Sequence, residues 1–116
     1  TSDSFETFYK FNQQNENAPI IFIHGIGLNH EIWDQQVNYF KKYNTIVYDL
    51  IGHGKTPFNK KQIAMKDFSN QLLKLVDSLN LNKFHLVGFS LGSLIARDFA
   101  SLYSNRLSSL TLFGTV

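Results

Sequence analysis

The feature that most constrains the fold of this chain is a regular alternation of short apolar runs with longer segments of helical spacing. Three short runs are mainly apolar and a fourth closes the series: Ile20–Ile23, Thr45–Tyr48, residues 84–87 and Leu107–Phe113. Such runs favour strands buried on both faces of a sheet. The segments between them are expected as helices at residues 31–42, 63–79 and 91–103. This order predicts an α/β fold, a mostly parallel sheet with helices on both faces.

The composition fits one globular domain and excludes several classes of partner. Of the 116 residues, 43% are hydrophobic, which is enough to build a core. The net charge of +2 comes from 11 basic residues scattered among 9 acidic ones, so we expect no nucleic-acid partner. The sequence has no cysteine, which excludes disulfides and thiolate metal sites. It shows neither a membrane-length apolar run nor a signal-peptide pattern, so we expect a cytoplasmic protein without a membrane partner.

Each of the three apolar runs leads directly into a glycine-bearing motif. The motifs are HGIG at residues 24–27, DLIGHG at residues 49–54 and GFSLG at residues 88–92. In a parallel sheet the carboxyl ends of the strands share one edge, and open α/β sheets bind their ligands there. The sequence therefore predicts that the three motifs lie together and form a site.

The third motif places Ser90 between a strand and a helix in the pattern G-x-S-x-G. A sharp strand-to-helix turn forces the serine backbone into a strained conformation and pushes its hydroxyl outward. The residues two before and two after it must lack a Cβ, which Gly88 and Gly92 satisfy. The start of the following helix favours developing negative charge. Ser90 is therefore the candidate nucleophile, with a glycine-rich turn carrying an incidental serine as the alternative.

The first motif supplies a partner for this serine. Acyl transfer needs two backbone N–H donors directed at the developing oxyanion. One comes from the residue after the nucleophile, here Leu91, and the other from a loop after an earlier strand. Gly25 and Gly27 allow such a loop to bend, which makes Ile26 the second candidate donor. For the second motif, residues 49–54, we expect a structural loop that frames the pocket rather than a catalytic one.

With these residues in place, the chain resembles the α/β-hydrolase family. The three motifs match HGxG, DxxGHG and GxSxG in the family's order and spacing, and the resemblance runs from residue 18 to residue 113. Residues 24–29 and 90–92, with Trp33, look like the pimeloyl-carrier-protein methyl esterase branch. Residues 48–54 look like oxoadipate enol-lactonases. Two departures are Ser93, where the family often has glycine, and Ser104, where it commonly has proline.

The resemblance implies hydrolysis of a small-molecule ester, thioester or lactone through an acyl-serine intermediate, without a cofactor. It also implies that the Ile20 strand lies between the Thr45 and residue-84 strands. Residues 5–11 would form an antiparallel strand outside the Thr45 strand. The alternatives on this fold are a C–C bond hydrolase, a cofactor-free haloperoxidase or a lyase. An alternative of another class is a non-catalytic binding protein such as a signal receptor.

The residues after Ser90 do not complete a catalytic triad. No histidine follows it, and its only later acidic residue, Asp98, lies eight positions into the next helix, roughly 12 Å along the helix axis. Family members run to more than twice this length, with a cap, an acid and a base in the second half. We therefore expect residues 1–116 to be the N-terminal portion of a single α/β-hydrolase domain, inactive by itself, with Leu107–Phe113 as an open sheet edge.

The four histidines and the glycines suggest no metal or nucleotide site. We expect His24 in the oxyanion loop, His30 at a helix start in a surface or capping role, and His85 in the core. No pair of histidines or carboxylates has metal-ligand spacing on one helix, so we expect no metal. No third glycine completes G-x-G-x-x-G after Gly25 and Gly27, which argues against a dinucleotide.

Overall fold

The computed structural model describes residues 6–57 and 62–114. Its five strands are β1 (Tyr9–Asn12), β2 (Ile20–Ile23), β3 (Thr45–Tyr48), β4 (Phe84–Phe89) and β5 (Leu107–Phe113). Its helices are α1 (Asp34–Tyr39), α2 (Met65–Ser78) and α3 (Leu91–Tyr103), with short 3-10 turns at η1 (His30–Trp33) and η2 (Ser104–Arg106). The predicted alternation of strands and helices is therefore present along the chain.

The strands form one sheet in the order β1-β3-β2-β4-β5. β2 pairs in parallel with β3 and β4, and β4 pairs in parallel with β5. β1 runs antiparallel along the outside of β3. This order, with β2 between β3 and β4 and with β5 at an edge, is the predicted one.

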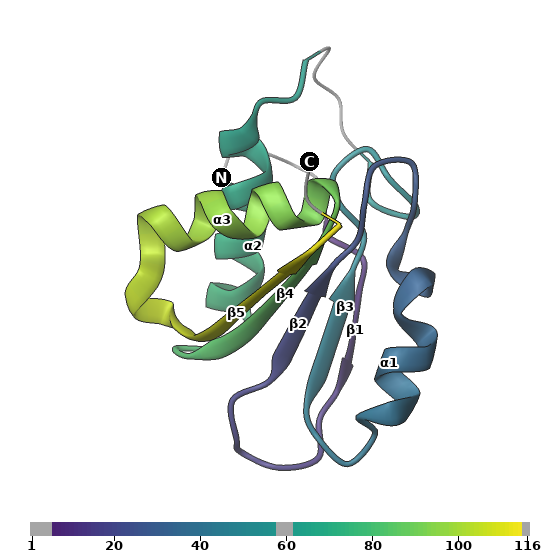
Figure 1. Cartoon of the computed structure of the whole chain (residues 1–116), viewed down its shortest axis with the longest axis vertical. Coiled ribbons are helices and arrows are strands. Elements are labelled where there is room, and N and C mark those ends of the chain that lie inside the picture. The colour runs from purple at the N-terminus through teal and green to yellow at the C-terminus, as the bar shows by residue number, and fades with distance from the viewer. Residues whose placement is uncertain (1–5, 58–61, 115–116) are drawn as a thin grey trace.

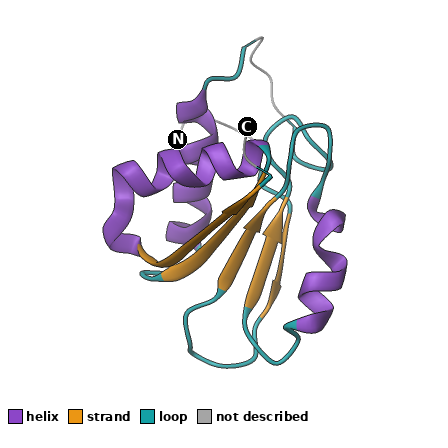
Figure 2. Cartoon of the chain, viewed as in Figure 1, coloured by secondary structure: helices purple, strands orange, loops and turns teal. Residues whose placement is uncertain are grey.

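Helices cover both faces of the sheet, as predicted. Figures 1 and 2 show α2 and α3 on one side and α1 on the other. The larger core lies on the α2 and α3 side, where Ile21, Leu86 and Phe99 are fully buried. A smaller cluster on the α1 side packs Trp33 against Phe22 and Val47. The carboxyl ends of β2 to β5 point to one edge, where α3 begins (Figure 1).

Several predicted boundaries are wrong. Within the described residues, β1 begins at Tyr9 rather than near residue 5, which itself lies outside them. The helix expected at residues 31–42 is divided into η1 and α1, and it ends at Tyr39. Asn29 caps η1 by accepting the Glu31 amide at 2.8 Å, and this tight first turn places Trp33 in the core. The helix predicted at residues 63–79 is slightly shorter, as α2.

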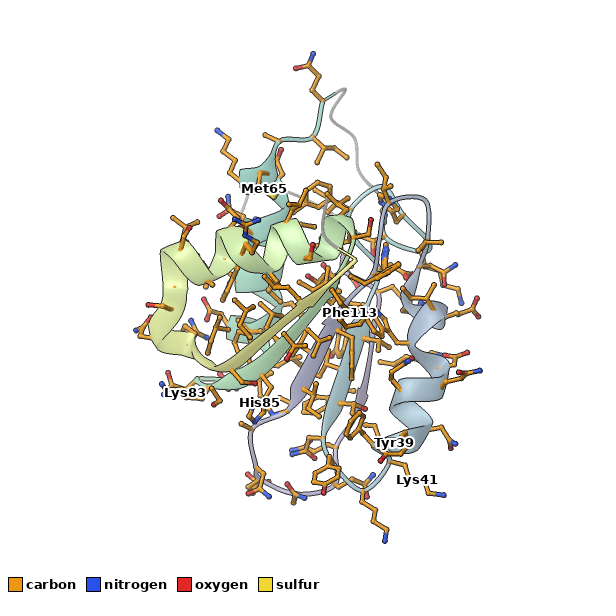
Figure 3. All side chains as sticks on the ribbon, in the orientation of Figure 1. Tyr39, Lys41, Met65, Lys83, His85 and Phe113 are labelled. Carbon is orange, nitrogen blue, oxygen red and sulfur yellow. The ribbon has the colours of Figure 1, made fainter. Side chains whose placement is uncertain are left out.

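β4 extends two residues further than predicted, and it is not buried on both faces. Its burial alternates, with Phe84, Leu86 and Gly88 buried and the intervening residues partly exposed. His85 is therefore no core histidine, which corrects that expectation; its Nδ1 lies 2.7 Å from the Ser109 hydroxyl of β5. α1 leaves this part of the sheet open, as an apolar groove of about 640 Å³ (Figure 3 labels His85 and Phe113 along it).

Candidate active site

The three glycine motifs follow the carboxyl ends of β2, β3 and β4. These strands are adjacent and in register, with Ile23 opposite Gly88. The three strands therefore end close together at the same edge of the sheet. The loops after β2 and β3 and the first turn of α3 therefore gather at the same edge (Figure 1). This is the edge at which open α/β sheets bind ligands.

Ser90 joins β4 to α3 in a strained conformation. Its backbone has φ 57° and ψ −119°, a region that costs a non-glycine residue about 1–3 kcal/mol. Hydrogen bonds hold it there from two sides. The Ser90 amide donates to the Phe113 carbonyl at 3.1 Å, and the Ser93 hydroxyl donates to the Ser90 carbonyl at 2.6 Å. Within the described residues the Ser90 hydroxyl has no hydrogen-bond partner, so it is available to a ligand.

The glycines on either side of Ser90 leave no room for a side chain. A Cβ on Gly88 would overlap the Gly92 carbonyl and lie 2.8 Å from the Ser93 Cα. A Cβ on Gly92 would overlap the Ile23 carbonyl and lie 2.7 Å from the His24 carbonyl oxygen. The start of α3 thus rests directly on the ends of β2 and β4.

The loop after β2 lies against Ser90. A Cβ built on Gly25 would stand 3.2 Å from the Ser90 Cβ, so the loop can approach this closely only without a side chain there. Gly27 has φ +74°, which turns the chain back, and the Leu28 amide donates to the Gly25 carbonyl at 3.2 Å. The Ile26 side chain is 70% exposed. Among the described residues, the amides of Ile26 and Leu91 have no hydrogen-bond acceptor, so both remain free to donate.

His24 is fully buried and both of its ring nitrogens are engaged. Nε2 accepts the Leu50 amide at 3.0 Å, so the ring proton resides on Nδ1, which donates to the Gly25 carbonyl at 2.7 Å. Burial lowers the pKa of His24 below its ordinary value of 6.5, and the nearby His53 ring, 5.3 Å away, acts in the same direction. The neutral imidazole thus links the loop after β2 to the loop after β3 by hydrogen bonds.

Asp49, which directly follows β3, forms hydrogen bonds both to the start of η1 and to the loop that contains Lys55. One carboxylate oxygen accepts the His30 amide at 2.7 Å and the His30 Nδ1 at 2.8 Å, and the other accepts the Lys55 amide at 2.8 Å. Burial alone would raise the pKa of Asp49, but these hydrogen bonds and the electrostatic interaction with His30 outweigh it and lower the pKa. His30 does begin a helical turn, η1, as expected, but it is buried and paired with Asp49 rather than at the surface, and the cap is Asn29.

Gln71 of α2 is another buried polar group in this framework, and it lies outside the three sequence motifs. Its side chain accepts the Ile51 amide at 3.1 Å and donates to the Asp49 carbonyl at 3.0 Å. The sequence does indicate that Gln71 is buried, because it lies three residues after Phe68 and four before Leu75, on the apolar stripe of α2. A polar residue on such a stripe indicates a buried hydrogen-bonding partner.

Acidification is expected to destabilise the protein, because His24 and Asp49 both have lowered pKa values in the folded state. Below pH 6.5 the unfolded chain gains a proton on His24 that the folded chain excludes, which favours unfolding. Asp49 adds the same effect below pH 3.8. We expect the thermal midpoint to fall as the pH is lowered from 7 through 6, and to fall less in His24→Gln. A midpoint that rises on acidification over this range would contradict this account.

The described part of the chain contains neither a metal cluster nor a membrane-spanning helix. Over residues 6–57 and 62–114, no cluster of three or more His, Cys, Asp or Glu residues has a metal-binding arrangement. No described helix has both the length and the apolar character needed to cross a membrane.

The fold and this edge together define a class: an open α/β protein with a strained serine at a strand-to-helix turn and a glycine loop against it. Residues 18–116 match the family model described as the alpha/beta hydrolase fold. The chain belongs to the α/β-hydrolase family, a family of hydrolases. The resemblance inferred from the three motifs is thereby confirmed.

Relatives agree with this assignment and are considerably longer. The chain is 37% identical over 84 residues to (E)-2-((N-methylformamido)methylene)succinate hydrolase of Acinetobacter baylyi, covering 72% of this chain and 32% of that protein. It is 32% identical over 99 residues to 3-oxoadipate enol-lactonase 1 of the same organism, covering 84% of this chain and 37% of that protein. The chain therefore spans about a third of the length of these curated relatives.

Solved structures show the same fold. A hydrolase from Pseudomonas aeruginosa superposes with a TM-score of 0.93 at 25% identity, covering 99% of this chain and 44% of that one. A thermophilic esterase from Thermogutta terrifontis superposes with a TM-score of 0.89 at 28% identity, covering 97% of this chain and 41% of that one.

Proposed function

We propose that this chain carries the nucleophile and the oxyanion site of a serine hydrolase that cleaves a carboxylic ester, thioester or lactone. The observation that carries the proposal is the strained Ser90 backbone with the Gly25 loop packed against it. Strain of this kind in a non-glycine residue is concentrated at functional sites, because it holds a side chain in a position that an ordinary turn does not provide. The similarity to an enol-lactonase and an esterase supports the class of substrate.

In the proposed reaction the Ser90 oxygen bonds to the acyl carbon while a base takes its proton. The carbonyl electrons move onto oxygen, where the free amides of Ile26 and Leu91 donate to the oxyanion. The N-terminus of α3, a helix of 13 residues, adds a favourable partial positive charge. The oxyanion then collapses, and the alcohol or thiol leaves with the proton. Water attacks the acyl-serine by the same route and releases the carboxylic acid.

We assign the base to a histidine outside residues 1–116. None of the four imidazoles in the chain is hydrogen-bonded to the Ser90 hydroxyl, although all four lie in the described part of it. His24 has both nitrogens engaged, His30 is paired with Asp49, His53 faces the Ile51 carbonyl and His85 lies beside Ser109. The greater length of the relatives leaves room for such a residue.

Covalent labelling tests the proposal. A fluorophosphonate probe reacts only with a serine whose hydroxyl is activated by a base. We expect it to label the protein as the cell produces it, with the adduct on the peptide that contains Ser90 by mass spectrometry. Absence of labelling would favour a non-catalytic binding protein on this fold. Labelling at another serine in a protein that hydrolyses esters would reject the assignment of Ser90.

The 116-residue chain alone is expected to show no multiple turnover of a short-chain nitrophenyl ester, because none of its imidazoles is hydrogen-bonded to the Ser90 hydroxyl. Circular dichroism should first establish that the purified chain is folded, so that inactivity reflects chemistry. Multiple turnover that disappears in Ser90→Ala would contradict the assignment of the base. It would direct attention to His53, whose ring is only partly buried.

A further inference from the structure

His24 lies directly after β2, where it touches the loop that approaches Ser90. The Leu50 amide can only donate, so His24 Nε2 must be the unprotonated nitrogen. The tautomer is thereby fixed, with the ring proton on Nδ1. This proton is directed at the Gly25 carbonyl, 2.7 Å away. The second loop, through Leu50, therefore determines which atom of the first loop the histidine holds.

The Gly25 carbonyl belongs to the same peptide group as the Ile26 amide. The described peptide bonds contain no cis isomer, so the C=O and N–H of this group point in opposite directions. A carbonyl held toward the buried His24 ring turns the Ile26 N–H away from that ring. The Leu28 amide, which donates to the same oxygen at 3.2 Å, reinforces this orientation.

The peptide group that joins Gly25 to Ile26 lies next to Ser90. Gly25 lies against Ser90, with only 3.2 Å between the position of its absent Cβ and the Ser90 Cβ. Within the described residues the Ile26 amide has no acceptor, although it lies next to this contact. A peptide whose carbonyl accepts hydrogen bonds is polarised, which also strengthens its N–H as a donor.

We propose that His24 is a positioning residue, which by donating from Nδ1 to the Gly25 carbonyl aims the Ile26 N–H at the carbonyl oxygen of a substrate bound at Ser90. The inference rests on the proposed function, because it requires an oxyanion at this position. In this proposal the Leu50 amide fixes the tautomer of the His24 ring. His24 itself neither accepts a proton nor touches the substrate.

Two substitutions separate this role from a purely structural one. His24→Asn places an amide nitrogen near the position of Nδ1, so it can keep the donor to Gly25 while losing the acceptor for Leu50. His24→Gln places an amide oxygen near the position of Nε2, so it can keep the acceptor and lose the donor. Each variant loses one hydrogen bond and packing volume at a fully buried site. His24→Asn leaves the buried Leu50 amide without its acceptor, whereas in His24→Gln the Gly25 carbonyl still accepts the Leu28 amide. A purely structural role therefore predicts the larger loss in His24→Asn, and thermal unfolding of both variants measures that cost separately from kcat.

Kinetics of ester hydrolysis by the whole protein are the readout. We expect His24→Gln to lower kcat about 10- to 100-fold with little change in KM, because the misdirected donor acts on the transition state. His24→Asn should retain most of kcat. Equal losses of kcat in the two variants, or losses that appear only in KM, would overturn the proposal. Loss of the wild-type activity in Ser90→Ala is the internal check: if activity survives that change, the proposed function itself has failed.

A second measurement does not depend on the variants remaining folded. Nitrogen-15 spectra of the wild-type protein distinguish a protonated from an unprotonated ring nitrogen. We expect His24 to be neutral, with its proton on Nδ1. A ring protonated at Nε2, or a mixture of tautomers, would overturn the proposal whatever the kinetics show.

Discussion

Ser90→Ala in the whole protein is expected to lower kcat for ester hydrolysis by about 10⁴- to 10⁶-fold, the loss typical of removing a serine nucleophile. The reason is that no covalent route remains, while the oxyanion donors and substrate contacts persist. The Ser90 backbone is held by the Phe113 carbonyl and by Ser93, neither of which involves the Ser90 hydroxyl. The substitution should therefore leave substrate binding and thermal stability nearly unchanged.

Ser93→Ala is the matched control, since it removes a hydroxyl three residues away in the same helical turn. Its hydroxyl donates to the Ser90 carbonyl at 2.6 Å, so its loss weakens the support of the strained turn without removing the nucleophile. A single hydrogen bond contributes about 1 kcal/mol, which limits the expected loss of kcat to about tenfold. Losses of similar size at the two positions would count against Ser90 as the nucleophile.

The sheet could be predicted from the sequence because its central strands are buried. β2 and β3 have nearly every residue buried, so apart from Thr45 they consist of apolar and aromatic residues and their limits are sharp. α3 has approximately the bounds expected, because its apolar residues show helical spacing directly after the turn at Ser90. The close approach of three glycine motifs also followed, because it depends only on strand order and direction.

The remaining features depend on contacts between distant parts of the chain. His30 is buried because Asp49, nineteen residues later, accepts both its amide and its ring, and no local pattern contains that pairing. His85 is partly exposed because α1 does not extend over the open side of β4, which strand composition alone does not reveal. The hydrogen bonds of His24, which underlie its proposed role, likewise needed the loop after β3 to be placed.

Gly92→Ala is expected to destabilise the protein by about 3 kcal/mol or more, at the upper end of the cost of overpacking a core. The added Cβ would overlap the Ile23 carbonyl and press on the His24 carbonyl oxygen, 2.7 Å away. Both obstacles are backbone atoms at the end of a central strand, so no side-chain rotation can relieve them. The first turn of α3 would have to move off β2, taking the Leu91 amide with it.

Gly27→Ala provides the control, because there the limitation is conformational and not spatial. Gly27 has φ +74°, which costs an alanine about 1–2 kcal/mol, but no atom lies within 4 Å of the added Cβ. We expect urea unfolding to show a clearly larger loss for Gly92→Ala than for Gly27→Ala, with similar m-values. If Gly92→Ala were tolerated as well as Gly27→Ala, the close seating of α3 on β2 would be wrong. The proposal that the Leu91 amide is an oxyanion donor would then lose its structural basis.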